Sequence, residues 1–257
     1  MTGPDDAPSD LPRQLARLWG LSGPATRGPK PGLTLERIVA AAIAVADTDG
    51  LAGLSMSRIA QDLGFSTMSL YRYVSTKDEL LLLAQDAAFG QPPKTKPGTD
   101  WRPALRSWAQ AEIAAYRRHA WTLQIPVAGP PLMPSQLAWL DAGLGILSAT
   151  PLLPNEKTSS ILLVTSYVRG VAQLERELET GRMGSDLTAE ELSRGVEQAF
   201  AMLVTPDRFP HLHRVVEQGG FDDEVRQDDQ GLDHELRFGL ERVLDGIAML
   251  VQQRTKG

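Results

Sequence analysis

The chain has 257 residues, of which 42% are hydrophobic and 23% are charged, and its formal net charge is −6. This length and composition predict a soluble globular protein with a small domain and a larger one. The absence of cysteine excludes disulfides, thiolate zinc sites, cysteine nucleophiles and redox sensing through thiols. Because no apolar run reaches about eighteen residues and residues 1–20 lack the pattern of a signal peptide, we expect no membrane span and a cytoplasmic location.

Residues 1–32 are expected to form a flexible N-terminal arm. Residues 1–10 are rich in Asp, Pro, Gly and Ser, a composition typical of disorder, and residues 11–19 have the spacing of a short amphipathic helix. Three prolines between Ser22 and Gly32 prevent a continuous helix there, so this basic stretch is predicted to be extended.

Residues 33–90 begin with a long helix and a short one. Thr34 caps the long helix, which ends at Asp49-Gly50. Ser55 or Ser57 caps the short helix that follows. Gly64 ends it, because only glycine takes the left-handed backbone without strain. The chain therefore turns sharply at this glycine.

A second short helix and a longer one follow the glycine. Ser66 is placed to cap the second short helix, in which Met68 or Ser69, together with Leu70 and Val74, points inward. Thr76-Lys77-Asp78-Glu79 then has the pattern of a capping box, which predicts a helix from Lys77 to about Phe89. Two sharp turns within about twenty residues fit a helix-turn-helix with a supporting helix.

This segment resembles the N-terminal domain of the TetR (tetracycline-repressor) family of transcriptional regulators. The matching residues are Leu54-Ser55, Ile59-Ala60, Leu63-Gly64-Phe65-Ser66, Leu70-Tyr71-x-Tyr73-Val74 and Lys77-Asp78-Glu79-Leu80. The motifs fall within residues 33–90, and the rest of the chain resembles the family only in its helical layout. The resemblance implies binding to a double-stranded DNA operator through bases and phosphates. The implied DNA-binding residues are Ser57, Arg58, Ser66, Thr67, Met68, Ser69, Tyr71, Arg72, Tyr73 and Lys77.

The charge of this segment neither supports nor opposes DNA binding by itself. Residues 31–90 contain four basic and seven acidic residues, a net charge of −3. Binding depends on which face carries the charges, and helix N-termini and hydroxyls also hold phosphates. The basic stretch before Gly32 is either an arm in the minor groove or a solvated linker.

Residues 91–257 predict further helices and no strand or internal repeat, so the fold class is all-α. We expect this part to be a C-terminal effector-binding and dimerisation domain. The expected helices cover residues 101–118, 135–149, 155–180, 188–204, 206–220 and 232–253, with proline-rich or acidic loops between them.

The two longest of these helices, 155–180 and 232–253, each carry a broad apolar face. The resemblance implies that they pair with the same helices of a second subunit in a four-helix bundle. A homodimer of this kind requires a roughly palindromic site, whereas the alternative is an apolar core within one chain.

The resemblance also implies a pocket for a small-molecule effector in the C-terminal domain. An apolar pocket with a few polar groups suits the aromatic-rich middle of the chain. The candidate residues are Asp86, Trp108, Tyr116, His119, Trp121, Trp139, Tyr167 and Arg169, with Gln124 as a further polar group. For each of them, ordinary packing is the competing interpretation.

The sequence predicts no catalytic residues, no cofactor and no metal site. His211 and His213 are two residues apart and so face away from each other on a helix, with no third ligand nearby. The acidic stretch 221–233 lacks the alternation of a calcium loop. The favoured function is a ligand-responsive regulator, most simply a repressor; the alternatives are an all-α small-molecule enzyme or carrier with a vestigial helix-turn-helix, and a DNA binder that no ligand regulates.

Overall fold

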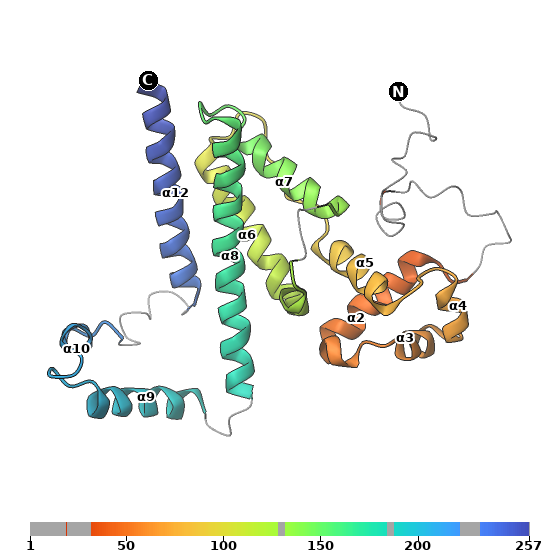
Figure 1. The fold of residues 1–257 in the computed structure, drawn as a ribbon, viewed down its shortest axis with the longest axis horizontal. Helices are drawn as coiled ribbons and strands as arrows, with labels where there is room; N and C mark the ends of the chain where they lie inside the picture. Colours follow the sequence, from red (N-terminus) through yellow and green to blue (C-terminus); the bar gives the residue numbers. More distant parts are fainter. Residues whose placement is uncertain (1–18, 20–31, 128–131, 184–187, 222–231, 257) are drawn as a thin grey trace.

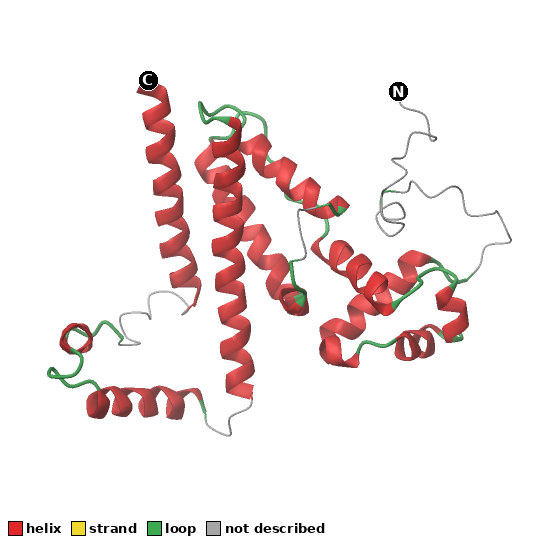
Figure 2. Ribbon diagram, in the orientation of Figure 1, coloured by secondary structure: helices red, strands yellow, loops and turns green. Residues whose placement is uncertain are grey.

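The computed structural model describes residues 19, 32–127, 132–183, 188–221 and 232–256. Every regular element in this part of the chain is a helix, which confirms the all-α prediction (Figures 1 and 2). Apart from Trp19 and Gly32, the predicted arm and its short helix lie outside the described residues.

The helices follow one another along the chain with the labels of Figure 1. They are α2 (Leu35–Gly53), α3 (Met56–Leu63), α4 (Thr67–Tyr71), α5 (Lys77–Phe89), α6 (Trp101–Arg118), the short 3₁₀ helix η1 (Ala120–Gln124), α7 (Pro134–Ile146), α8 (Pro154–Met183), α9 (Ala189–Leu203), α10 (Pro210–Glu217) and α12 (Leu232–Lys256).

Three of these elements differ from the sequence prediction. The break predicted at Asp49-Gly50 is present, because the backbone of Gly50 is non-helical with a positive φ of 67°, but a further helical turn follows it and ends at Gly53. Residues 120–124, which fall in a loop between the expected helices, form η1. The short helix expected over 206–220 is confined to Pro210–Glu217, because Pro210 cannot donate a backbone hydrogen bond and suits the first turn.

The N-terminal helices α2 to α5 enclose a core of their own. Ile38, Ile59, Leu70 and Leu80, one from each helix, are fully buried in it. Apolar side chains from η1 complete this core, although η1 follows α6 in the chain. The small domain is therefore in direct contact with the larger one.

The second core lies between α6, α7, α8 and α12. The apolar faces expected on the two longest helices point into it: Val164 and Val168 of α8 and Leu240 and Leu244 of α12 are at most 3% exposed. Part of the apolar face expected on 232–253 is thus buried within one protomer. No described helix is long and apolar enough to cross a membrane.

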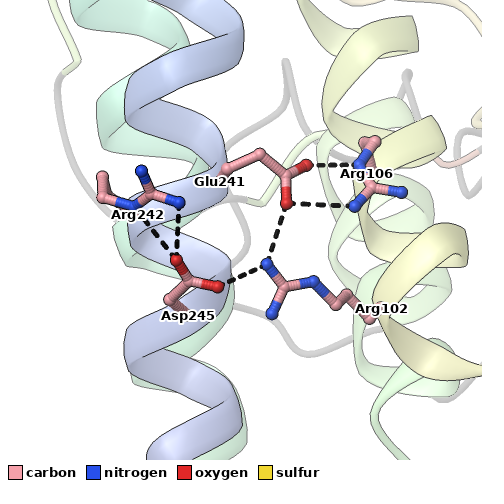
Figure 3. Close-up of polar contacts among 5 residues, drawn as sticks. All are labelled: Arg102, Arg106, Glu241, Arg242 and Asp245. Atoms are coloured by element: carbon pink, nitrogen blue, oxygen red, sulfur yellow. Dashed lines mark hydrogen bonds and ion pairs between the residues drawn. The ribbon is translucent and has the colours of Figure 1, made fainter.

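An ion-pair network ties α12 to α6 (Figure 3). Arg102 donates to Glu241 at 2.8 Å and to Asp245 at 2.6 Å, and Arg106 makes two further hydrogen bonds to Glu241. Hydrogen bonds from Arg106 and Arg102 lower the pKa of the Glu241 carboxyl to about 2. The C-terminal helix is therefore held in a defined register against α6.

Candidate DNA-binding surface and effector site

The turn between α3 and α4 is built by three local hydrogen-bonding devices. Ser55 caps α3 by accepting the backbone N–H of Arg58 at 3.2 Å. Gly64 is left-handed (φ 73°, ψ 29°) and donates to Gln61, which closes the end of α3. Ser66 then caps α4 by accepting the N–H of Ser69 at 3.3 Å. These contacts fix the direction in which α4 leaves the turn.

Helix α4, the reading helix (Thr67–Tyr71), presents one face to the core and the other to solvent. Leu70 is fully buried, whereas Met68 is 72% exposed and Tyr71 is 47% exposed. Thr67 and Ser69 are half-buried, so Ser69 rather than Met68 turns toward the domain. A helix this short owes its shape to its neighbours, and here its exposed face is free to enter a groove.

Tyr73 has a different position from Tyr71. It is half-buried, and its hydroxyl donates to the backbone carbonyl of Leu33 at 2.8 Å. This contact joins the end of the reading helix to the start of α2. Tyr73 therefore has a packing role within the small domain, and its predicted contact with DNA stays a prediction.

The other predicted DNA-binding residues surround the reading helix. Ser57, Ser66, Arg72 and Lys77 are exposed. Arg58 is exposed as well, but its guanidinium is 3.0 Å from Asp62 and 3.4 Å from Asp49. The surface thus offers hydroxyls and cations at the N-termini of α3, α4 and α5, which are groups that bind phosphates.

Helix α5 begins beside this surface with a second cap. Thr76 accepts the N–H of Glu79 at 3.0 Å, and the buried Glu79 carboxylate accepts the N–H of Ser75 at 2.6 Å. Lys77, the first residue of α5, stays in solvent. The cap is therefore made by Thr76 and Glu79, and the side chain of Lys77 takes no part in it.

Four of the predicted effector residues lie where α5 meets the larger domain. Trp108, Tyr116 and Trp139 are buried, and each ring lies within 5.6 Å of another ring in a chain that includes Phe89 of α5. Asp86 accepts the backbone N–H of Ser135 at 2.9 Å, and burial raises the pKa of this carboxyl. These residues pack the junction of α5 with α6 and α7, and their contact with an effector stays a prediction.

His119 and Trp121 lie at the other contact between the domains. The indole N–H of Trp121 donates to Asp47 of α2 at 2.7 Å, and Nδ1 of His119 is 2.9 Å from the same carboxylate. Trp121 belongs to the core of the small domain. Gln124, the neighbouring polar candidate, is exposed. His119 and Trp121 therefore contribute to the contact between the two domains. Their contact with an effector stays a prediction.

The last two predicted residues extend from α8. The hydroxyl of Tyr167 donates to the carbonyl of Glu235 at 2.7 Å, which places its ring against the start of α12. Arg169 donates to the carbonyl of Leu123 at 3.1 Å, at the end of η1. Neither residue was expected to have these contacts, because they join segments far apart in the chain.

Sequence reasoning missed Glu112, which is 4% exposed in the middle of α6. Its helical spacing gave a signal, since it lies four residues from Trp108 and four from Tyr116 and so shares their face. Burial raises its pKa to about 8, against the lowering effects of Thr165 and Arg169. Within the described residues, no group of three or more potential ligand side chains is arranged for a metal ion.

Two short helices are joined by a turn at a left-handed glycine, and the second helix is exposed. This motif, attached to a larger helical domain, is typical of helix-turn-helix DNA-binding regulators. Comparison with known proteins gives the family. Residues 38–84 match "Bacterial regulatory proteins, tetR family", and residues 92–251 match "Tetracyclin repressor-like, C-terminal domain". The chain belongs to the TetR family of transcriptional regulators.

Individual relatives agree with this assignment. The chain is 37% identical over 249 residues to the HTH-type transcriptional repressor DrrR1 of Streptomyces coeruleorubidus, covering 95% of this chain and 88% of that protein. Its fold matches ActR of Streptomyces coelicolor in complex with actinorhodin, with a TM-score of 0.70 and 24% identity over 87% of this chain and 99% of that one. TetR of Acinetobacter baumannii has the same fold at 17% identity, with a TM-score of 0.58 over 85% and 98% of the two chains.

Proposed function

We propose that this chain is a ligand-responsive transcriptional repressor that binds a palindromic operator as a homodimer and is released by a small, largely apolar effector. The observation that carries this proposal is the exposed face of the reading helix, held by Gly64 and two serine caps in a member of the TetR family. The relative DrrR1 is named a repressor, which supports the same direction of control. The DNA-binding part is residues 33–90, and residues 91–257 bind the effector and the second subunit.

The DNA-binding step uses two kinds of contact. Thr67, Met68 and Tyr71 enter the major groove and read base edges, while hydroxyls and cations around them hold phosphates. The phosphate contacts are assigned to Ser57, Arg58, Ser66, Ser69, Arg72, Tyr73 and Lys77. Because the net charge of the chain is −6, affinity for unrelated DNA is modest and sequence-specific contacts matter more.

The homodimer uses the outward faces of α8 and α12, which carry large apolar residues that are about half exposed in the protomer. On α8, Leu163 and Leu174 are 51% and 50% exposed and lie three helical turns apart. On α12, Phe238 and Met249 are 56% and 57% exposed with the same spacing. A stable interface needs about 1,600 Å² or more, and two long helices from each subunit supply such an area.

The effector acts through the contacts between the two domains. The aromatic chain at Phe89 and the Asp47 contacts of η1 both hold the small domain against the larger one. A molecule that takes the place of these side chains changes the separation of the two reading helices. That separation must match one turn of DNA, about 34–36 Å, so a small shift releases the operator. The effector must favour the released state by about 1–3 kcal/mol.

A gel-shift with the upstream region of the protein's own gene tests the DNA-binding step. We expect a complex that unlabelled operator removes, that unrelated DNA of equal length leaves intact, and that weakens steeply with salt. An all-α enzyme or carrier gives no such complex. A complex that no compound in a screen of lipophilic molecules releases indicates a DNA binder without an effector.

The subunit contact is tested by sedimentation of Leu174→Asp and Phe238→Asp, each with its circular dichroism. We expect monomers of unchanged helix content, because both side chains are exposed in the protomer. Val127→Asp is the matched control, since Val127 is 75% exposed but lies outside both helices. A dimer that persists in the double variant places the interface elsewhere.

A further inference from the structure

The cations predicted to contact DNA are held in different ways. Arg72 and Lys77 are exposed near the reading helix, and neither makes an ion pair with any residue that the structure describes. Arg58 is exposed as well, but its guanidinium lies between the carboxylates of Asp49 and Asp62. The charge of Arg58 is therefore compensated before DNA arrives, whereas the charges of Arg72 and Lys77 are not.

The two carboxylates fix the orientation of the Arg58 guanidinium. Its Nε donates to both carboxylate oxygens of Asp62, one turn further along α3, at 3.1 and 3.0 Å. Its Nη1 lies 3.4 Å from the carboxylate of Asp49, near the end of α2. Within the described part of the chain, Nη2 has no hydrogen-bond or ion-pair partner. Arg58 thus keeps one unused donor group, Nη2, in an orientation that side chains of two helices determine.

The charges of this cluster distinguish one placement of a duplex from others. One guanidinium and two carboxylates give a net negative charge, so a phosphate that approaches from an arbitrary direction is repelled. A phosphate in line with Nη2 meets a charged donor that is already oriented, and the arginine loses little further side-chain entropy. All three side chains are exposed, so each ion pair changes a binding equilibrium by at most about fivefold.

We propose that Asp49 and Asp62 are positioning residues for Arg58 and that they increase the specificity of DNA binding. By holding the guanidinium, they restrict its phosphate contact to the register that the reading helix imposes on the operator. They also prevent the arginine from following the phosphates of unrelated DNA, which lowers affinity for the wrong partner. The inference rests on the proposed function, because it specifies how the operator contact of Arg58 is made.

Fluorescence-anisotropy titrations of the full-length protein with two labelled duplexes of equal length test the proposal. One duplex comes from the upstream region of the protein's own gene, and the other has an unrelated sequence. In the double variant Asp49→Asn, Asp62→Asn, affinity for the unrelated duplex should rise about tenfold, because two ion pairs no longer hold the arginine. The salt slope of that binding should steepen by about 0.9, the value of one further phosphate contact. Affinity for the upstream duplex should change less than about twofold, because the arginine gains freedom from the acids but loses its fixed orientation.

Two controls separate this effect from a general change of charge. Asp78 is exposed in the first turn of α5 and makes no ion pair with a described residue. Asp78→Asn should therefore raise both affinities by the same factor and leave their ratio unchanged. The second control introduces Asp62→Asn into Arg58→Met, a side chain of similar length without a charge. In that background, Asp62→Asn should raise affinity for the unrelated duplex no more than Asp78→Asn does.

Three results overturn the proposal: an equal rise of both affinities in the double variant, no change in either affinity, or an effect of Asp62→Asn that persists without Arg58. Circular dichroism of each variant checks the fold, which exposed substitutions should leave unchanged. If the wild type binds the upstream duplex selectively and the double variant keeps the same selectivity, the proposed function stands and this inference fails. If the wild type forms no selective complex, the proposed function itself fails.

Discussion

The burial of Glu112 makes a quantitative prediction about stability that needs no ligand. The pKa of this carboxyl is about 8 in the folded protein, against 4.5 for an unperturbed glutamate. The folded state therefore holds the proton more tightly than the unfolded chain. The contribution of Glu112 to stability is complete below pH 4.5 and is lost as the pH rises through about 8. Integrating this linkage gives a loss of roughly 4 kcal/mol between pH 5 and pH 9.

The measurement is urea unfolding of the wild type and Glu112→Gln at several pH values and one fixed protein concentration, because subunit association also contributes to stability. The glutamine is neutral throughout, so the difference between the two proteins isolates this one group from all the others that titrate. We expect the free energy of unfolding of Glu112→Gln to increase relative to that of the wild type as the pH rises. Parallel pH profiles would refute the reasoning, since they require a carboxyl that ionises in the folded protein as easily as in water.

Other substitutions test the remaining parts of the structure. Tyr71→Ala should weaken operator binding about tenfold to a hundredfold without changing the melting temperature, because the side chain is 47% exposed; unchanged affinity in a gel-shift would contradict its place in the groove. Lys77→Ala should weaken binding to all sequences alike and reduce the salt slope by about 0.9, and a loss confined to one base pair would show that Lys77 reads sequence. Gly239→Ala should cost ~1–3 kcal/mol, because the new methyl group collides with the Tyr167 ring that packs over this glycine. Gly246→Ala is its control on the same helix: with open space around it, it should stabilise by ~0.5–1 kcal/mol, and equal effects in thermal unfolding would rule out the collision.

The small domain was predictable because its shape depends on local chemistry. The caps at Thr34, Ser66 and Thr76 and the left-handed Gly64 act within four residues of themselves, so the sequence pattern contains nearly all the information. The pattern left one local choice open, whether Met68 or Ser69 turns inward, and packing settled it in favour of Ser69. The exposed side of the reading helix follows from these local rules.

The larger domain was predictable as a set of helices but not as a set of contacts. The apolar stripe of residues 232–253 fits an interface between subunits and a core within one subunit equally well, and Leu240 turned out to be in the core. The hydrogen bond of Tyr167 to the carbonyl of Glu235 and that of Trp121 to Asp47 span 68 and 74 residues. No local spacing encodes such pairs. Aromatic residues grouped in the sequence therefore proved to serve several different contacts.

These long-range contacts also indicate how much free energy an effector must supply to change the contact between the domains. Trp121 and His119 hold Asp47 from one side of η1, and Arg169 holds the carbonyl of Leu123 from the other. A hydrogen bond of this kind is worth about 0.5–1.5 kcal/mol net, so loss of two of them matches the 1–3 kcal/mol that an allosteric effect requires. Arg169 also lies 5.8 Å from the ring centre of Tyr116, one of the predicted effector residues, so a ligand that moves this ring would disturb the residue that holds η1. Through η1, the contacts of this arginine connect the predicted effector residues to α2.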